Sequence, residues 1–363
     1  MIETPVIFWA DQARIQVICS NKHIQFGHIE VEDRPIPAKH QNDEAGIDAA
    51  AYLPESIWEF LSTLQSSQAI KTLILDKSLD AKWHKIPWER LNCRGQKLAQ
   101  FWRVIRFARV IESNAESAFL RHNNLVWDQW ENDSVSALSD VTTRLCKIEK
   151  IEKYVKDGID VSGYRRLVIF AHGGETANCL FFTKEGECWN PRLPKTLPPE
   201  IFIMACTSYD SNLHDFIVQC LERGAKTIIC GHGKLDEQSM LAAVAEFIRE
   251  EKPAYQTLWK LQEKTSNKKD GDVHWLRLYG DAPISEFDFA LFQAFQTNQF
   301  EPAFEQFKAL GFQTLLEQTQ AGKNHWQLTQ HCLLSCALYL AEKEAHSELD
   351  SLRQQLKNKP IQY

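Results

Sequence analysis

The spacing of apolar residues changes along the chain, and its first part predicts a small α/β subdomain. Short runs rich in β-branched and aromatic residues, separated by polar turns, predict an antiparallel meander. These runs are Val6–Ala10, Arg14–Ser20 and His23–Val31. Asp43–Ser66 has a helical spacing that Pro54 interrupts, and Thr72–Leu75 and Phe101–Val110 have the composition of strands. We therefore expect an N-terminal α/β subdomain over residues 1–112.

The middle part alternates buried strands with helices. Leu167–Ala171, Glu200–Ala205 and Lys226–Cys230 are almost continuously apolar, which is typical of parallel strands covered on both faces. Strand-like residues also occur within 118–130, and helical spacing covers 134–156, 213–223 and 237–250. A last apolar run, Val273–Tyr279, is expected to form an edge strand. Residues 113–283 thus predict an α/β sheet with crossover helices.

The last part, residues 284–363, has few β-branched runs and predicts a helical C-terminal region. Its apolar spacing suits three or four amphipathic helices without a fixed-period repeat. His331, Cys332 and Cys336 lie close together there but have no fourth metal ligand at a recognisable distance, so packing is the expected role.

Composition and charge narrow the function classes. Hydrophobic residues make up 44 % of the 363 residues and charged residues 25 %, the balance of a soluble globular protein. The formal net charge of −7 argues against direct, unspecific nucleic-acid binding. The sequence shows neither a signal peptide nor an apolar run near the roughly 20 residues that cross a bilayer, so we expect a cytoplasmic protein without membrane contact. The ten cysteines form no CxxC pair, and we expect no metal and no cofactor.

Two predicted strands are followed directly by residues that could be catalytic. The first runs into His172-Gly173-Gly174 and the second runs into Cys206. Because the carboxyl ends of neighbouring parallel strands meet at one edge of a sheet, we expect the imidazole and the thiol to lie close together. This predicts Cys206 as a nucleophile, His172 as its proton-transfer partner, and the backbone amides of Gly173 and Cys206 as oxyanion donors.

Other residues compete for these roles. Cys206 could instead be a buried structural cysteine like Cys230, which also lies near a strand end. His232 lies between glycines after the third strand and is a second candidate for the base. His214, in the helix after Cys206, is expected to be a surface or capping residue.

Five ordered blocks resemble a known family, the CHAT peptidases of the caspase–separase group (clan CD). The central blocks are LVIFAHGG, IFIMAC and the KTIICG segment that follows Gly224-Ala225. They are flanked by IPWERL with WRVIR, which ends at Arg106, and by WLRLYGD over Trp275–Asp281. The resemblance covers about residues 70–282. Five blocks in the family's order are far more specific than any one of them.

The resemblance implies a fold and a site. The fold is a caspase-like αβα sandwich, and residues 1–112 would be a degenerate, pseudo-protease-like partner domain. His172 matches the catalytic histidine and Cys206 the nucleophile. Thr207 and Ser208 stand where the family often has an acidic residue and a threonine, which affects the expected substrate preference more than the fold.

Acidic residues near the predicted site suggest a specificity pocket. Asp128, Glu131 and Asp133 follow one strand and Asp210 follows Cys206, so Asp128 or Asp210 could bind a Lys or Arg side chain of a substrate. The alternative is that these acids are solvated surface residues. The resemblance further implies a protein substrate, a regulatory protein partner that could dock on the helical C-terminal region, and a bacterial antiviral-defence or cell-death setting. A catalytically silent scaffold, or an enzyme of other acyl transfer, remains the alternative.

Overall fold

The computed structural model describes part of the chain, which falls into two compact units. The described residues are 6–11, 14–19, 22–29, 31, 47–64, 71–93, 96–98, 102–110, 124–128, 160–173, 179–183, 186–205, 211–231, 236–249, 253–265 and 276–282. One unit contains the described residues of 6–29 and 71–79, and the other contains those of 31–64 and 80–282. The domain boundaries expected near residues 112 and 283 stay a prediction, and the expected helical region 284–363 lies outside the described residues.

The first unit is built around the predicted meander, which is confirmed. Strands β1 (Val6–Asp11), β2 (Arg14–Cys19) and β3 (Lys22–His28) pair antiparallel in chain order. Strand β5 (Lys71–Leu75) pairs parallel with β1 on its other side. Residues 6–9 of β1 and 73–75 of β5 are buried, and this apolar burial stabilises the short strand set.

Short elements precede the central sheet of the second unit. They are β4 (Ile47–Asp48), η2 (Ala49–Ala51), α1 (Glu55–Leu64), α2 (Ala81–Lys85), η3 (Trp88–Arg90), β6 (Leu91–Cys93) and β7 (Gln96–Lys97). The helix expected over Asp43–Ser66 is shorter, because it starts only after Pro54. Strands β4, β6 and β7 form a separate small sheet.

The second unit contains a mostly parallel sheet in the order β8-β16-β15-β14-β10-β9. Its strands are β8 (Trp102–Val110), β9 (Asn124–Asp128), β10 (Arg166–Phe170), β14 (Glu200–Met204), β15 (Thr227–Gly231) and β16 (Leu276–Ala282). Strands β9, β10, β14 and β15 run parallel, whereas β16 is antiparallel to β15 and parallel to β8. The α/β fold is confirmed. The expected edge position of β16 is wrong, because β8 pairs with its other side.

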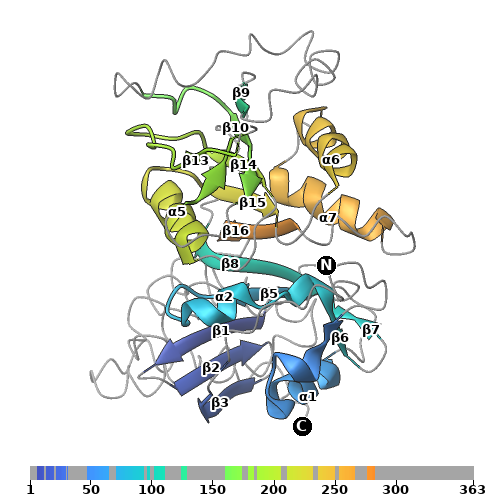
Figure 1. Ribbon diagram of the computed structural model, residues 1–363. Coiled ribbons are helices and arrows are strands. Elements are labelled where there is room, and N and C mark those ends of the chain that lie inside the picture. Colours follow the sequence, from blue (N-terminus) through green and yellow to red (C-terminus); the bar gives the residue numbers. More distant parts are fainter. Residues whose placement is uncertain are drawn as a thin grey trace, which may run out of the picture. The chain divides into compact units, whose positions relative to one another are not determined.

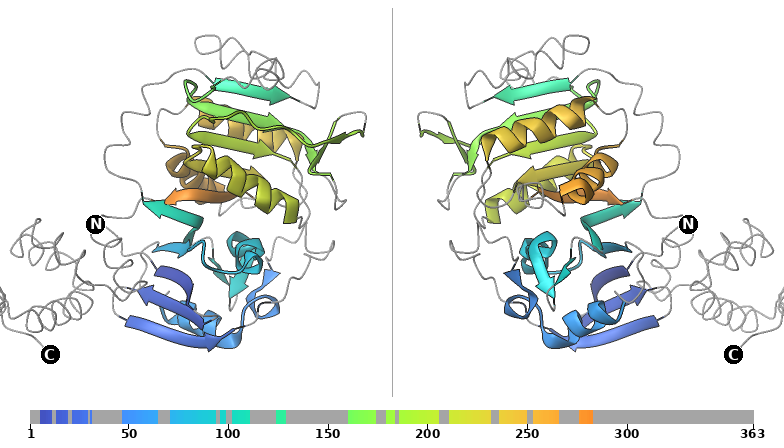
Figure 2. Two further views of the ribbon diagram at one scale, coloured as in Figure 1. Left: turned by 90° about the vertical axis from the view of Figure 1, so that its left-hand side faces the viewer. Right: turned by 90° about the vertical axis from the view of Figure 1, so that its right-hand side faces the viewer.

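Helices cover both faces of this sheet. Helix α5 (Ser211–Glu222) lies on one face, and α6 (Glu237–Arg249) and α7 (Ala254–Thr265) lie on the other (Figures 1 and 2). Alternate residues of a strand pack against the helices on opposite faces. Ile203 belongs to the cluster beneath α5, whereas the ring of Phe202 stacks on that of Phe247 of α6, with the ring centroids 4.6 Å apart. This two-sided burial explains the continuous apolar runs.

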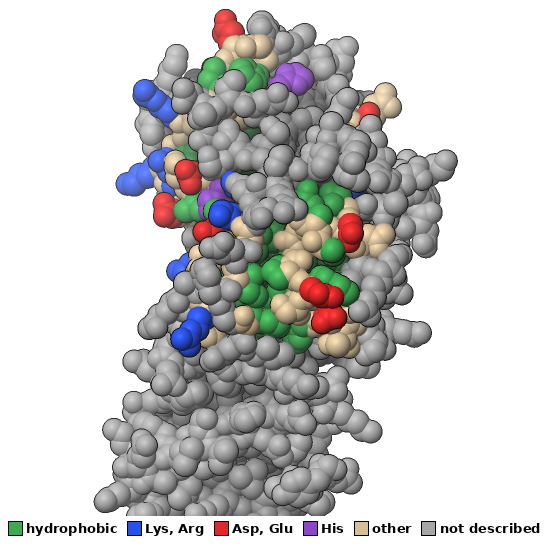
Figure 3. Space-filling model, turned by 60° about the horizontal axis from the view of Figure 1, so that its bottom comes forward, with side chains coloured by type: hydrophobic (Ala, Val, Ile, Leu, Met, Phe, Trp, Pro, Cys, Tyr) green, Lys and Arg blue, Asp and Glu red, His purple; other side chains and the backbone are tan. Residues whose placement is uncertain are grey.

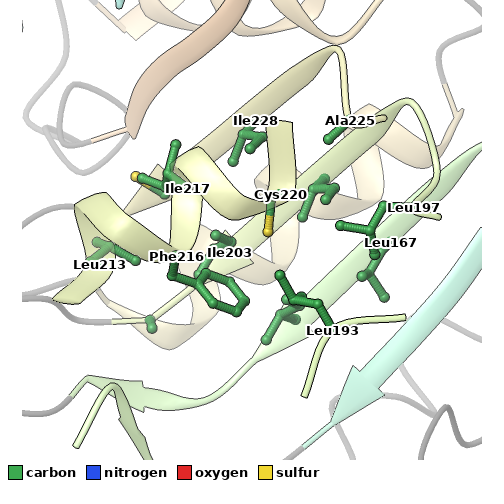
Figure 4. Close-up of a cluster of buried hydrophobic side chains, with 14 of the residues drawn as sticks. Leu167, Leu193, Leu197, Ile203, Leu213, Phe216, Ile217, Cys220, Ala225 and Ile228 are labelled. Atoms are coloured by element: carbon green, nitrogen blue, oxygen red, sulfur yellow. The ribbon is translucent and has the colours of Figure 1, made fainter. Parts of the chain in front are cut away.

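The face under α5 is a dense apolar cluster that fixes this helix on the strands. Phe216, Ile217 and Cys220 of α5 are buried against Leu167 and Ile203 of the sheet (Figure 4). The helix ends at Glu222, and Gly224, two residues later, has a positive φ of 100° that suits the turn back to β15.

At the amino ends of the strands, Glu200 joins three elements. Its carboxylate accepts from Arg166 Nε of β10 at 2.6 Å and from the Ala254 amide at the start of α7 at 2.8 Å. Both charged side chains are buried, so their mutual pairing offsets the cost of taking them out of water.

A second buried ion pair explains the PWE and arginine blocks of the sequence. Arg106 of β8 is completely buried and forms a bidentate pair with Glu89 of η3 at 2.5 and 2.8 Å. It also donates to the carbonyl oxygens of His84 at 2.9 Å and Ile86 at 3.1 Å. Burial alone would lower the pKa of Arg106, but the adjacent Glu89 carboxylate raises it, so the guanidinium stays charged. The pair ties the segment before β6 to the sheet.

Gly280, the glycine of the WLRLYGD block, occupies a position where only glycine fits. Gly280 has a φ of 105° at an irregularity in the β8–β16 pairing. A Cβ atom at this position would overlap the carbonyl oxygen of Lys226. Both the backbone angle and the close approach require glycine here.

Candidate active site

The two strands that precede His172 and Cys206 end at the same level of the sheet. Phe170, the last residue of β10, is the register partner of Met204, the last residue of β14. The Ala171 amide continues the pairing and donates to the Met204 carbonyl oxygen at 3.3 Å. His172 and Cys206 are each the second residue after these partners in the sequence. Cys206 itself lies outside the described residues.

His172 belongs to a small sheet of its own. Strand β11 (His172–Gly173) pairs antiparallel with β12 (Phe181–Phe182), which pairs with β13 (Cys188–Trp189). Strands β12 and β13 thus form a short antiparallel hairpin. The His172 side chain is exposed, and Gly173 is half-buried.

One face of this small sheet packs on α5. Phe181 is fully buried, with its ring 5.5 Å from that of Trp189 and 5.7 Å from that of Phe216. Phe216 comes from the helix that follows Cys206 in the chain. The segment with His172 is therefore positioned by the same apolar cluster that holds α5.

Cys230, the example of a buried structural cysteine with which Cys206 was compared, has that role in the structure. It pairs in register with Ile203 inside the sheet and is buried. Burial raises the pKa of its thiol to about 12, although Arg277 and Arg106 act in the opposite direction. Cys220 on α5 is also buried, and its pKa is likewise raised to about 12 by burial. Neither thiol forms appreciable thiolate near neutral pH, which a nucleophile needs.

The remaining predicted residues are only partly placed. The backbone of Asp128, at the end of β9, is in register with Phe170 of β10, so this residue ends the strand next to the one that leads to His172. Its side chain is outside the described part. Asp210, Glu131, Asp133 and His232 also lie outside the described residues.

His214, expected as a surface or capping residue, is half-buried on α5. Its ring lies 6.0 Å from that of His84, a buried residue of α2. Burial lowers the pKa of His214 below its ordinary value of 6.5; Asp215 and Asp80 partly oppose this, and Lys85 adds to it. The sequence pattern did not indicate this contact, because α2 and α5 are far apart in the chain.

A disulfide between Cys179 and Cys188 is a second feature that sequence reasoning missed. It closes the β12–β13 hairpin, with the two Cα atoms 5.5 Å apart. Asn190 supports it from the end of the hairpin: its Oδ1 accepts from the Leu180 amide at 2.8 Å and its Nδ2 donates to Cys188 Sγ at 3.6 Å. The sequence signal for it was only a pair of cysteines nine positions apart.

One face of the described part of the chain carries side chains of both charges. On the face in Figure 3, described hydrophobic side chains gather in one area, and acidic and basic side chains both lie around it. Within the described ranges, no group of three or more His, Cys, Asp or Glu side chains is arranged to hold a metal ion. No helix in the described part of the chain is long and apolar enough to cross a membrane.

No family model matches the chain, and no curated protein matches it.

Proposed function

We propose that this protein is a caspase-like cysteine endopeptidase in which Cys206 is the nucleophile and His172 transfers protons. The observation that carries the proposal is the register of β10 with β14, in which Phe170 and Met204 are partners. His172 and Cys206 follow these partners at equal distance in the sequence, which favours a thiol and an imidazole at one edge of the sheet. The five sequence blocks that resemble CHAT peptidases support the same assignment.

The reaction follows from these roles. The Cys206 thiolate attacks the scissile carbonyl carbon, and the C=O electron pair moves onto oxygen. Backbone amides of Gly173 and Cys206 stabilise that oxyanion. When the C–N bond breaks, His172 gives its proton to the leaving amine. Water then attacks the thioester while His172 accepts its proton, and the acid product and the free thiolate are released.

Acidic residues near the strand ends suggest the substrate preference. Asp128 ends the strand next to β10, and Asp210 follows Cys206 in the sequence. A carboxylate in this region would pair with a Lys or Arg side chain at the P1 position of a protein substrate. We therefore propose cleavage after basic residues.

Labelling of the thiol tests the proposal. An irreversible peptidyl electrophile with arginine at P1 should modify wild-type protein at Cys206. Labelling should be lost in Cys206→Ala and strongly slowed in His172→Ala. Cys230→Ala is the matched control, because its buried thiol should not react in any case. Labelling that survives in Cys206→Ala at the same rate would refute the assignment.

The rival hypothesis is a scaffold that keeps the fold without catalysis. It predicts that neither labelling nor peptide cleavage occurs under any activating condition, including addition of a binding partner. Cleavage of a peptide library by wild type, with loss in Cys206→Ala, separates the two hypotheses. An enzyme of other acyl transfer would label at Cys206 but leave the peptides intact.

Regulation by a partner protein is part of the proposal. An unrestrained cytoplasmic endopeptidase would damage its own cell, so we propose that a protein partner docks on residues 284–363 in a bacterial defence or cell-death setting. Deletion of residues 285–363 should change activation or partner binding. Unchanged activation and binding in the truncated protein would refute this role.

A further inference from the structure

We infer that Cys179 and Cys188 form a reversible thiol–disulfide modification site that controls the order of the small sheet carrying His172. The link to catalysis rests on the proposed function, whereas the modification and its effect on the sheet do not.

The register of the small sheet places one cysteine in the same row as His172. His172 pairs with Phe182, and Phe182 pairs with Cys188. Residues directly opposite one another in antiparallel strands project from the same face. His172 and Cys188 are exposed and Phe182 is partly exposed, so this row forms the outer face of the sheet. The next row, Gly173, Phe181 and Trp189, faces the core.

The disulfide connects the outer row to the core. Cys179 is buried, with only 2 % of its surface exposed, whereas Cys188 is exposed. The bond therefore fixes the outer strand β13 to the buried start of the hairpin. Strands β11 and β13 have only two residues each. Few backbone hydrogen bonds therefore hold the small sheet when the disulfide is absent.

Exposure makes this disulfide chemically accessible from one side. A thiolate of a small molecule such as glutathione can attack the exposed Cys188 sulfur, which forms a mixed disulfide and releases Cys179 as the leaving thiolate. A second glutathione thiolate then frees Cys188. In the reverse direction the two thiols lose two electrons and two protons, and glutathione disulfide is reduced to two glutathione molecules.

The other described cysteines that carry free thiols cannot take part in the same exchange. Cys220 and Cys230 are both buried, and burial raises the pKa of each thiol to about 12. Exchange depends on access and on the thiolate fraction, and both thiols lack these properties. Of these four cysteines, only the Cys179–Cys188 pair is open to thiol–disulfide exchange.

The consequence concerns the position of His172. In the oxidised protein the hairpin is closed by two links to the segment just before β12, the disulfide from Cys188 to Cys179 and the hydrogen bond from the Leu180 amide to Asn190. Reduction removes one closure and leaves β11 and β12 less firmly held. A displacement of about 1 Å in a catalytic group can lower its rate by up to about 100-fold. We therefore expect the oxidised protein to be the more reactive form at Cys206, by about tenfold or more.

The test uses the full-length protein in glutathione buffers that range from reducing to oxidising. Free thiols are trapped with an alkylating reagent and located by mass spectrometry. Hydrogen–deuterium exchange of peptides covering residues 166–190 is measured in the same buffers, since it reports on the sheet without any activity. The rate of Cys206 labelling is measured in parallel. Cys188→Ala is the control variant, because its exposed position allows substitution without disturbing the core.

The expected results are a Cys179–Cys188 linkage that forms in oxidising buffer, slower hydrogen exchange in the linked state, and faster labelling of Cys206. In Cys188→Ala, exchange and labelling should match the reduced wild type in every buffer. No linkage at any glutathione ratio, or equal exchange in both states, would overturn the inference. If Cys206 never labels while linkage and exchange change together, the proposed function fails and the modification site stands.

Discussion

Removing Glu89 should destabilise the second unit far more than an ordinary substitution does. Glu89→Met leaves the guanidinium of Arg106 charged, fully buried and without its carboxylate. Breaking a buried ion pair from one side costs about 3–5 kcal/mol. Two carbonyl oxygens still accept from Arg106, which cannot neutralise a full charge, so we expect a cost in this range.

Replacing both partners should cost much less, and the structure shows why. In Glu89→Met/Arg106→Met no buried charge remains, and methionine matches glutamate in length although it is shorter than arginine. The carbonyl oxygens that lose Arg106 each keep another donor: His84 O accepts from Arg277 at 3.3 Å and Ile86 O from the Trp88 amide at 2.8 Å. Because no buried acceptor loses its last partner, we expect the double variant to lie within about 2 kcal/mol of wild type.

Urea denaturation followed by hydrogen exchange of β8 and β16 measures both effects. Urea reports the free energy of unfolding, and exchange shows whether the loss is local to the strands next to the pair. Glu222→Met on exposed helix surface is the matched control, with an expected change within about 0.5 kcal/mol. The reasoning is refuted if Glu89→Met costs less than about 1 kcal/mol, or if the double variant is no more stable than the single one.

Three further changes test other features. Gly280→Ala should lower the free energy of unfolding, measured by urea titration, by about 1–3 kcal/mol or more, because the positive φ is strained for alanine and the new Cβ would overlap Lys226. Gly163→Ala is the control and should change this free energy little, because its Cβ would meet nothing within 4 Å. Because burial lowers the pKa of His214, the unfolded chain takes up a proton at this residue before the folded protein does, so the free energy of unfolding should fall as the pH drops below about 6.5. His214→Gln should make this dependence on pH weaker, and pH profiles that run parallel in wild type and variant would contradict the reasoning. Asp128→Asn should slow labelling by an arginine-P1 probe at least about tenfold and leave a leucine-P1 probe unaffected; equal slowing of both would argue against a specificity role.

The central strands could be predicted from the sequence because their physics is local to each strand. Residues 167–171, 200–205 and 226–230 are apolar at nearly every position, and burial on both faces is the direct cause. Helix α5 was also predictable from its apolar spacing. The position of β16 within the sheet could not be predicted in this way. Its second neighbour, β8, comes from a distant part of the chain, so no local pattern could reveal that β16 lies between two strands.

Helix α7 was not predicted because part of the surface it buries is polar. Thr257 and Gln262 are buried beside Ala254 and Leu258, and Gln262 donates to the Leu276 carbonyl oxygen at 3.4 Å. A hydrophobic pattern cannot show a face that includes hydrogen-bonded polar side chains.

For the site, the sequence predicts which strands lead to candidate catalytic residues, but not which side chains hold those residues in place. The alternation of strands and helices was enough to expect that the strands before His172 and Cys206 are neighbours. The support by Phe181, Phe216 and the disulfide depends on contacts between segments that periodicity does not connect.

The Glu200 network lies at the amino ends of β10 and β14, away from the ends that lead to His172 and Cys206. The segments that follow β10, β14 and β15, residues 172–178, 206–210 and 232–235, contribute neither of these two contacts. The residues of this ionic anchor are thus separate from the segments that we propose to contact a substrate. An engineer could exchange the segments after these strand ends to retarget the protein while the ionic anchor keeps the sheet intact, and natural divergence could follow the same route.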